Sequence, residues 1–87
     1  MVTFGIIKLL NGKIRVEVQR PQHPATAHRD YHSTEGVRRV LSDLGVPDDV
    51  SQFYFTLLPD IEPNQLLQFP PLYVPEYRLA AQGLKPE

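Results

Sequence analysis

The sequence predicts a single α+β domain with the element order strand, strand, helix, strand, strand. The first observation behind this is a hairpin pattern over residues 2–20, where two strand-like runs flank an Asn-Gly dipeptide typical of a tight turn. The second is an amphipathic helix pattern over residues 34–44. The third is a pair of β-like runs at residues 52–58 and 66–69.

The hairpin is predicted from its turn outward. Asn11-Gly12 is expected to form a two-residue type I′ turn, and such a turn fixes which residues of the two strands face each other. On the core face this register pairs Leu9 with Ile14, Ile7 with Val16 and Gly5 with Val18, and on the other face it pairs Leu10 with Lys13, Lys8 with Arg15 and Ile6 with Glu17. The first strand is apolar on both faces and is therefore expected to be central, whereas the alternating, charged second strand suits an edge.

A long connection and a helix follow. Residues 21–33 contain two prolines and all three histidines without any hydrophobic period, which predicts a loop. Ser33 or Thr34 is expected to cap the helix, and Gly45 to end it. The apolar face of this helix consists of Val37, Val40, Leu41 and Leu44.

Two more strands complete the predicted sheet. Apolar residues alternate with Tyr54 and Thr56 over residues 52–58, which predicts a third strand that Pro59 ends. Residues 66–69 are expected to return beside the first strand. With a right-handed crossover through the helix, strand three lies parallel in a mixed four-stranded sheet of order 2-1-4-3.

The C-terminal segment has a different composition. Four prolines between residues 70 and 86 exclude regular strand pairing there. Residues 1–69 are therefore expected to form the domain, and residues 70–87 a Pro-rich tail that is docked or partly disordered. Within this tail, Pro75 and Gly83 favour one or two helical turns between them.

Several segments resemble ubiquitin. They are Lys13 to Val18, Thr34-Glu35 with Val37 and Leu41, and Gly45-Val46-Pro47-Asp48-Asp49 before Phe53-Tyr54-Phe55. These are similar to the second strand, the helix, and the turn and third strand of ubiquitin, so the resemblance covers about residues 1–58 and implies a β-grasp fold. It places the isoleucine of ubiquitin's binding patch at Tyr54 and the leucine of that patch near Leu10. Because this chain has no C-terminal Gly-Gly, the resemblance implies an interaction module of ubiquitin-like shape rather than a modifier or carrier.

Composition narrows the classes of function. The 87 residues include no cysteine, which excludes disulfides, a thiol nucleophile and thiolate metal sites. The net charge is −1, but residues 1–40 carry seven Lys/Arg against three Asp/Glu, and residues 41–87 carry two against seven. The chain has neither a start resembling a signal peptide nor an apolar run of membrane-spanning length, so we expect a soluble, cytoplasmic protein with no membrane partner.

The function expected from these patterns is a non-catalytic protein-interaction module that binds another protein or a second copy of itself as a homodimer. Its binding surface is expected on the sheet face away from the helix, because apolar groups on an uncovered face suit an interface. The residues expected there are Phe4, Ile6, Leu10 and Tyr54 as apolar anchors and Lys8 and Arg15 as charges. A separate motif, Pro70, Pro71, Leu72 and Tyr73, has the PPxY pattern that WW domains bind as polyproline II.

Two alternatives stay open. The basic half, with Lys8, Lys13 and Arg15 beside Phe4, could bind the phosphates and bases of a nucleic acid. The loop that contains His23, His28, Asp30 and His32 has residue types that bind zinc or perform acid–base chemistry. Their spacing matches no established metal or catalytic signature, so no catalytic residue, metal ligand or cofactor is predicted.

Overall fold

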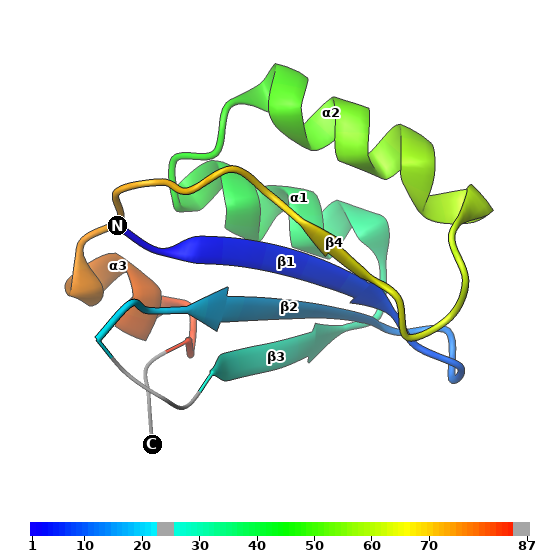
Figure 1. The fold of residues 1–87 in the computed structure, drawn as a ribbon, viewed down its shortest axis with the longest axis horizontal. Coiled ribbons are helices and arrows are strands. Elements are labelled where there is room, and N and C mark those ends of the chain that lie inside the picture. Colours follow the sequence, from blue (N-terminus) through cyan, green and yellow to red (C-terminus); the bar gives the residue numbers. More distant parts are fainter. Residues whose placement is uncertain (23–25, 85–87) are drawn as a thin grey trace.

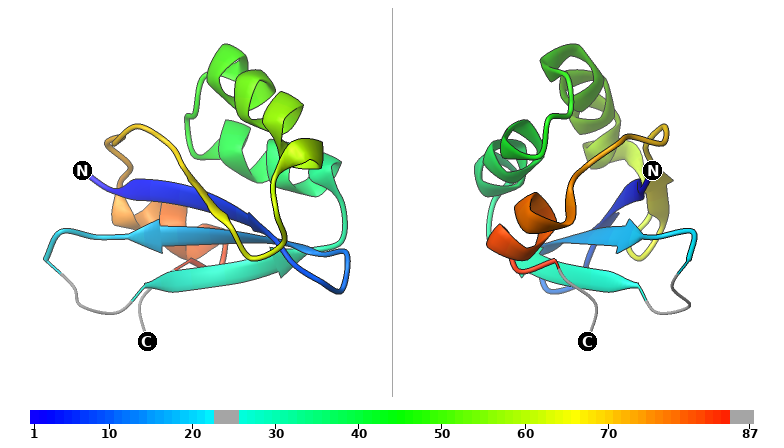
Figure 2. Two further views of the ribbon diagram at one scale, coloured as in Figure 1. Left: turned by 45° about the vertical axis from the view of Figure 1, so that its right-hand side comes forward. Right: turned by 90° about the vertical axis from the view of Figure 1, so that its left-hand side faces the viewer.

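Residues 1–22 and 26–84, which the computed structural model describes, form an α+β fold of two layers (Figure 1). One layer is a four-stranded sheet, and Figure 2 shows the helices gathered on one side of it. In chain order the elements are β1 (Thr3–Lys8), β2 (Ile14–Gln19), β3 (Ala27–Tyr31), α1 (Thr34–Asp43), α2 (Asp48–Leu57), the 3₁₀ turn η1 (Leu58–Asp60), β4 (Leu66–Gln68) and α3 (Glu76–Ala81).

The sheet has the order β3-β2-β1-β4, and every pairing is antiparallel. The strand expected at residues 66–69 is confirmed as β4 beside β1. The mixed sheet of order 2-1-4-3 is wrong, because residues 52–58 form helix rather than strand and β3 arises within the expected loop. β3 carries His28, Arg29 and Asp30 at its centre, and so it lacks the apolar run by which a strand is recognised.

The hairpin loop has three residues rather than two. Leu9 N–H donates to Lys13 C=O at 2.9 Å, and Gly12 N–H donates to Leu9 C=O at 3.1 Å. Gly12 alone takes a positive φ, of 86°, while Asn11 does not. This is the pattern of a type I turn followed by a glycine in the left-handed region, which is the usual three-residue hairpin.

The extra loop residue shifts the register by one and exchanges the two faces of β1. Phe4 lies opposite Val18 and Ile6 opposite Val16, instead of the expected pairs. The observed register buries these four side chains completely, whereas the expected one would bury Gly5 and Ile7 in place of Phe4 and Ile6. Burial of apolar area therefore decides the register over the Asn-Gly turn preference.

The core lies between the sheet and the helices. α1 is confirmed: Ser33 Oγ accepts from Gly36 N–H at 3.2 Å as the N-cap, and Gly45 follows the helix with a φ of 95°. The core side chains are Val2, Phe4, Ile6, Ile14, Val16, Val18, Val37, Val40, Leu41, Leu44, Val46, Phe55, Leu58, Phe69, Val74, Leu79 and Leu84.

α2 replaces the expected third strand, and three features explain why a helix forms. Pro47 provides an extended residue at the N-cap, and Asp48 and Asp49 complement the helix dipole in the first turn. Ser51, Phe55 and Leu58 then recur at helical spacing on the buried side. The alternation of aromatic residues is compatible with a strand, but this helical set is the one that reaches the core.

The C-terminal segment packs onto the same core. Leu72 exchanges two backbone hydrogen bonds with Val2, at 2.8 and 2.9 Å. α3 follows Pro75 as expected, and Leu79 and Leu84 are fully buried. Arg20, at the end of β2, is also buried and binds the Glu76 carboxylate.

Candidate functional site

α2 has chemically different sides. The side toward α1 is polar and includes Asp48, Ser51 and Gln52. The opposite side is apolar and lies toward the chain around β4, where Tyr54 stacks on Phe69 with ring centroids 4.2 Å apart. A helix that packed only against α1 would have its apolar residues on the side that faces α1. This apolar side of α2 lies away from α1, so packing against α1 does not explain it.

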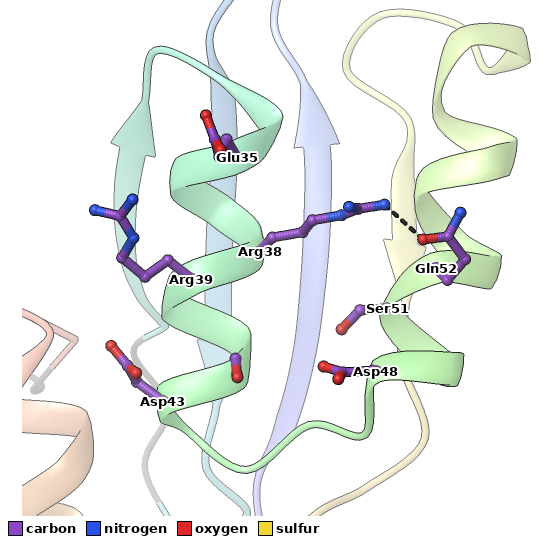
Figure 3. Close-up of a pocket in the computed structure, with 8 residues that line it drawn as sticks. Glu35, Arg38, Arg39, Asp43, Asp48, Ser51 and Gln52 are labelled. Atoms are coloured by element: carbon purple, nitrogen blue, oxygen red, sulfur yellow. Dashed lines mark hydrogen bonds between the residues drawn. The ribbon is translucent and has the colours of Figure 1, made fainter.

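The polar side borders a groove between α1 and α2 of about 510 Å³. Figure 3 shows Arg38 reaching across it from α1 to Gln52 of α2, and the Arg38 Nη2 to Gln52 Oε1 distance is 2.6 Å. The other lining residues are Glu35, Arg39, Ser42, Asp43, Asp48 and Ser51. This lining provides serine hydroxyls and carboxylates but no histidine that could act as a neutral base beside a serine nucleophile.

The apolar side of α2 forms a stripe that we call the outer stripe: Val50, Phe53, Tyr54 and Leu57, spaced i, i+3, i+4 and i+7. Phe53 is 60% exposed and Leu57 is 37% exposed, while Val50 and Tyr54 are half-buried. The rings of Phe53 and Tyr54 are nearly perpendicular, with their centroids 5.4 Å apart. The outer stripe thus continues from the core cluster to the surface.

β4 lies next to this stripe and is the last strand of the sheet. Phe69 N–H donates to Phe4 C=O at 2.8 Å, and Leu67 is paired with Ile6. Because bonded residues alternate along an antiparallel pair, the N–H and C=O groups of Leu66 and Gln68 point away from β1. Both residues are exposed, and we call this side of the strand the β4 edge.

A small apolar hollow of about 180 Å³ lies between the start of α2 and the chain after β4. Its walls include Val46 and Val50 on one side and Phe69, Pro70 and Pro71 on the other. Pockets for drug-sized ligands measure about 300–1,000 Å³, so this hollow suits a single apolar side chain.

The opposite edge of the sheet differs from the β4 edge. β3 carries charged side chains: Arg15 of β2 binds Asp30 at 2.7 Å, and Arg29 donates to Gln82 C=O at 3.1 Å. The hydrogen bond from Arg15 holds the pKa of Asp30 below its usual value. Charged residues on an edge oppose pairing with another strand, so β3 is protected in a way that Leu66-Leu67-Gln68 is not.

The structure separates the residues that sequence reasoning placed on one surface. Phe4 and Ile6 are core residues on the helix side of the sheet, so their assignment as exposed anchors is wrong. Arg15 does lie on the uncovered face, beside Asp30. Tyr54 belongs to the outer stripe of α2 instead of a strand.

Lys8 and Leu10 lie together at the hairpin end. Both border an apolar groove of about 430 Å³ that Phe55, Leu58 and Pro59 also line. Lys8 Nζ donates to Pro59 C=O at 3.3 Å, and Leu10 is 79% exposed. These two residues therefore share a surface, but it is distinct from the β4 edge.

The residues of the two alternatives, a histidine-containing metal or catalytic loop and a basic nucleic-acid surface, do not gather at one place in the described part of the chain. His23 lies outside the described residues, and within the described ones no three His, Asp or Glu side chains gather as metal ligands. The basic residues bind groups on different surfaces: Lys8, Arg15, Arg20, Arg29 and Arg38 contact Pro59, Asp30, Glu76, Gln82 and Gln52. No helix in the described part of the chain is long and apolar enough to cross a membrane.

Sequence reasoning missed the outer stripe and the β4 edge. A signal for the stripe was present, because residues 50, 53, 54 and 57 have helical spacing. The same stretch also alternates like a strand, and that alternation predicts the strand expected at residues 52–58.

Comparison with known proteins adds no relative: no family model, curated protein or solved structure was found to match this chain.

Proposed function

We propose that this protein is a non-catalytic interaction module that binds an extended segment of another protein along the β4 edge. The observation that carries the proposal is the β4 edge itself, uncharged and exposed, next to the outer stripe of α2. Strand addition of this kind obtains affinity from main-chain hydrogen bonds and specificity from pockets for alternate side chains.

The backbone of β4 defines the occupant's shape. The N–H and C=O groups of Leu66 and Gln68 match those of an extended chain lying antiparallel to them. A helix or a small molecule would not satisfy this row of donors and acceptors. The occupant is therefore an extended peptide.

The surrounding side chains define its composition. The hollow beside Val50 takes one apolar side chain, and the exposed Phe53 and Leu57 provide a further apolar contact. Residues 47–74 carry four carboxylates and no Lys or Arg. We infer that the bound segment alternates apolar residues and carries basic ones at its ends.

We also propose that the domain has a ubiquitin-like shape, which the hairpin with α1 packed across it supports. A fold of that kind hosts many functions. The interaction proposal does not depend on it.

The experiment uses a blocked heptapeptide in which leucine and threonine alternate between terminal lysines, titrated into the full chain and followed by amide NMR. We expect the amides of Leu66 and Gln68 and those of the outer stripe to shift together. Phe53→Ser should weaken binding about tenfold, the effect of losing about 1.4 kcal/mol at one anchor. Tyr77→Ser, which changes a similarly exposed aromatic residue on α3, should leave binding unchanged.

A second peptide, N-methylated on alternate residues, tests the main-chain hydrogen bonds and should not bind. No shift at millimolar peptide, or equal binding of the methylated peptide, would contradict the proposal. Shifts of Leu66 and Gln68 that grow with protein concentration alone would instead assign the β4 edge to a second copy of this chain. Light scattering over the same concentrations would report that dimer.

A further inference from the structure

The segment after β4 exposes selected side chains between two buried ones. Phe69 and Val74 are both core residues. Between them Pro70 and Pro71 are exposed, and Tyr73 is 73% exposed. Leu72 is half-buried. The segment is therefore held at residues 69, 72 and 74 and exposed at residues 70, 71 and 73.

The backbone of this segment is held extended. Leu72 N–H donates to Val2 C=O at 2.9 Å, and Val2 N–H donates to Leu72 C=O at 2.8 Å. Each proline ring fixes its own φ near −65° and also keeps the residue before it out of the helical region. The segment is thus restrained near the polyproline II geometry before any partner arrives.

We propose that residues 70–73 are a second interaction site, at which this chain is the ligand and a WW-type domain is the receptor. The exposed residues are the two prolines and the tyrosine of the PPxY pattern, and the anchored Leu72 is its variable position. Recognition of such segments uses an aromatic-lined groove that accepts preformed polyproline II. Holding the segment in advance reduces the conformational entropy lost on binding.

Tyr77 provides a control within the same chain. It lies on α3, four residues from the motif tyrosine, and is 70% exposed. Because Tyr77 follows no proline pair, a receptor for the PPxY pattern would bind Tyr73 and not Tyr77. A receptor that merely binds exposed aromatic residues would not distinguish the two.

The experiment is isothermal titration of the full chain with a purified WW domain of the class that binds PPxY peptides. We expect 1:1 binding that Tyr73→Ala weakens at least tenfold and that Tyr77→Ala retains. Phe53→Ser, which removes an anchor of the outer stripe, should also retain it, so this site and the proposed function can fail separately. Urea denaturation of each variant checks that its fold is unchanged.

The free peptide of residues 68–77 serves as the reference ligand. If the folded protein binds the WW domain as tightly as this peptide or more tightly, presentation by the fold is supported. Binding by the peptide but not by the folded protein would show that the fold hides the motif and would overturn the proposal. Absence of binding by both, or full binding by Tyr73→Ala, would overturn it as well.

Discussion

Arg15 and Arg20 each bind a carboxylate with Nε 2.7 Å from its oxygen, but their surroundings differ. The Arg15 side chain is about one-third exposed beside Asp30, whereas Arg20 is buried and also donates from Nη2 to Leu84 C=O at 2.6 Å. An exposed ion pair is screened by water, while removing Arg20 leaves the buried Leu84 carbonyl without the donor that it has in the structure. The two ion pairs are therefore expected to contribute unequally to stability, although their Nε–O distances are equal.

We predict that Arg20→Ala lowers the free energy of unfolding by about 2 kcal/mol, because the buried Leu84 carbonyl loses its donor. Arg15→Ala should leave the urea midpoint nearly unchanged. Urea denaturation followed by circular dichroism measures both. Equal shifts in the two variants would show that burial does not determine the contribution of these pairs.

At the scale of elements, the sequence is most informative where several local signals coincide. α1 combines the Ser33 cap, one apolar face and Gly45 after its last turn, and each signal agrees with the others. For α2 the signals conflict, because aromatic residues favour strands while the residues at 51, 55 and 58 have helical spacing. Packing against the core favours the helix, and contacts between distant segments cannot be inferred from the local sequence.

Replacing glycine by alanine is expected to have opposite effects on stability at two positions, and this difference tests the geometry of the elements that contain them. Gly12 has a φ of 86° in the hairpin loop, where a Cβ is strained even though nothing lies within 4 Å of it. Gly36 lies in the first turn of α1, where a Cβ would make ordinary contacts with Ser33 and Tyr31. We predict that Gly12→Ala destabilises the protein by about 1 kcal/mol and that Gly36→Ala stabilises it by up to about 1 kcal/mol.

Thermal and urea denaturation of the two variants provide the check. Stabilisation by Gly12→Ala would contradict the left-handed loop residue and, with it, the three-residue turn that sets the register of β1 and β2. Destabilisation by Gly36→Ala would contradict its place in the helix.

At the scale of the whole molecule, a single residue in one loop decides which residues can form a binding site. The expected two-residue turn would place Phe4 and Ile6 outside, and the observed three-residue turn buries them. Because side chains alternate along a strand, a shift of one exchanges an entire face. The β4 edge could be anticipated only in part, since β4 itself was predicted but the position of α2 beside it depends on the fold.

The C-terminal segment tests how far the core extends along the chain. Val74, Leu79 and Leu84 are core residues, and Arg20 joins β2 to both Glu76 and the Leu84 carbonyl. Each of these three aliphatic side chains contributes about 2 kcal/mol by burial. The net stability of a small domain is only about 5–15 kcal/mol, so losing these buried contacts is a large perturbation.

We predict that a chain ending at Phe69 loses its cooperative unfolding transition in urea. Leu79→Ala should keep that transition but lower the free energy of unfolding by about 3 kcal/mol, because it leaves a cavity while the rest of the segment still packs. Tyr77→Ala, two residues earlier on the exposed side of α3, should have little effect. A truncated chain with an unchanged urea midpoint would mean that residues 1–69 hold the core alone and that the C-terminal segment only rests on it. The loss of cooperativity would make residues 70–84 part of the folding unit, and the exposed prolines and tyrosine would then be displayed by the core itself.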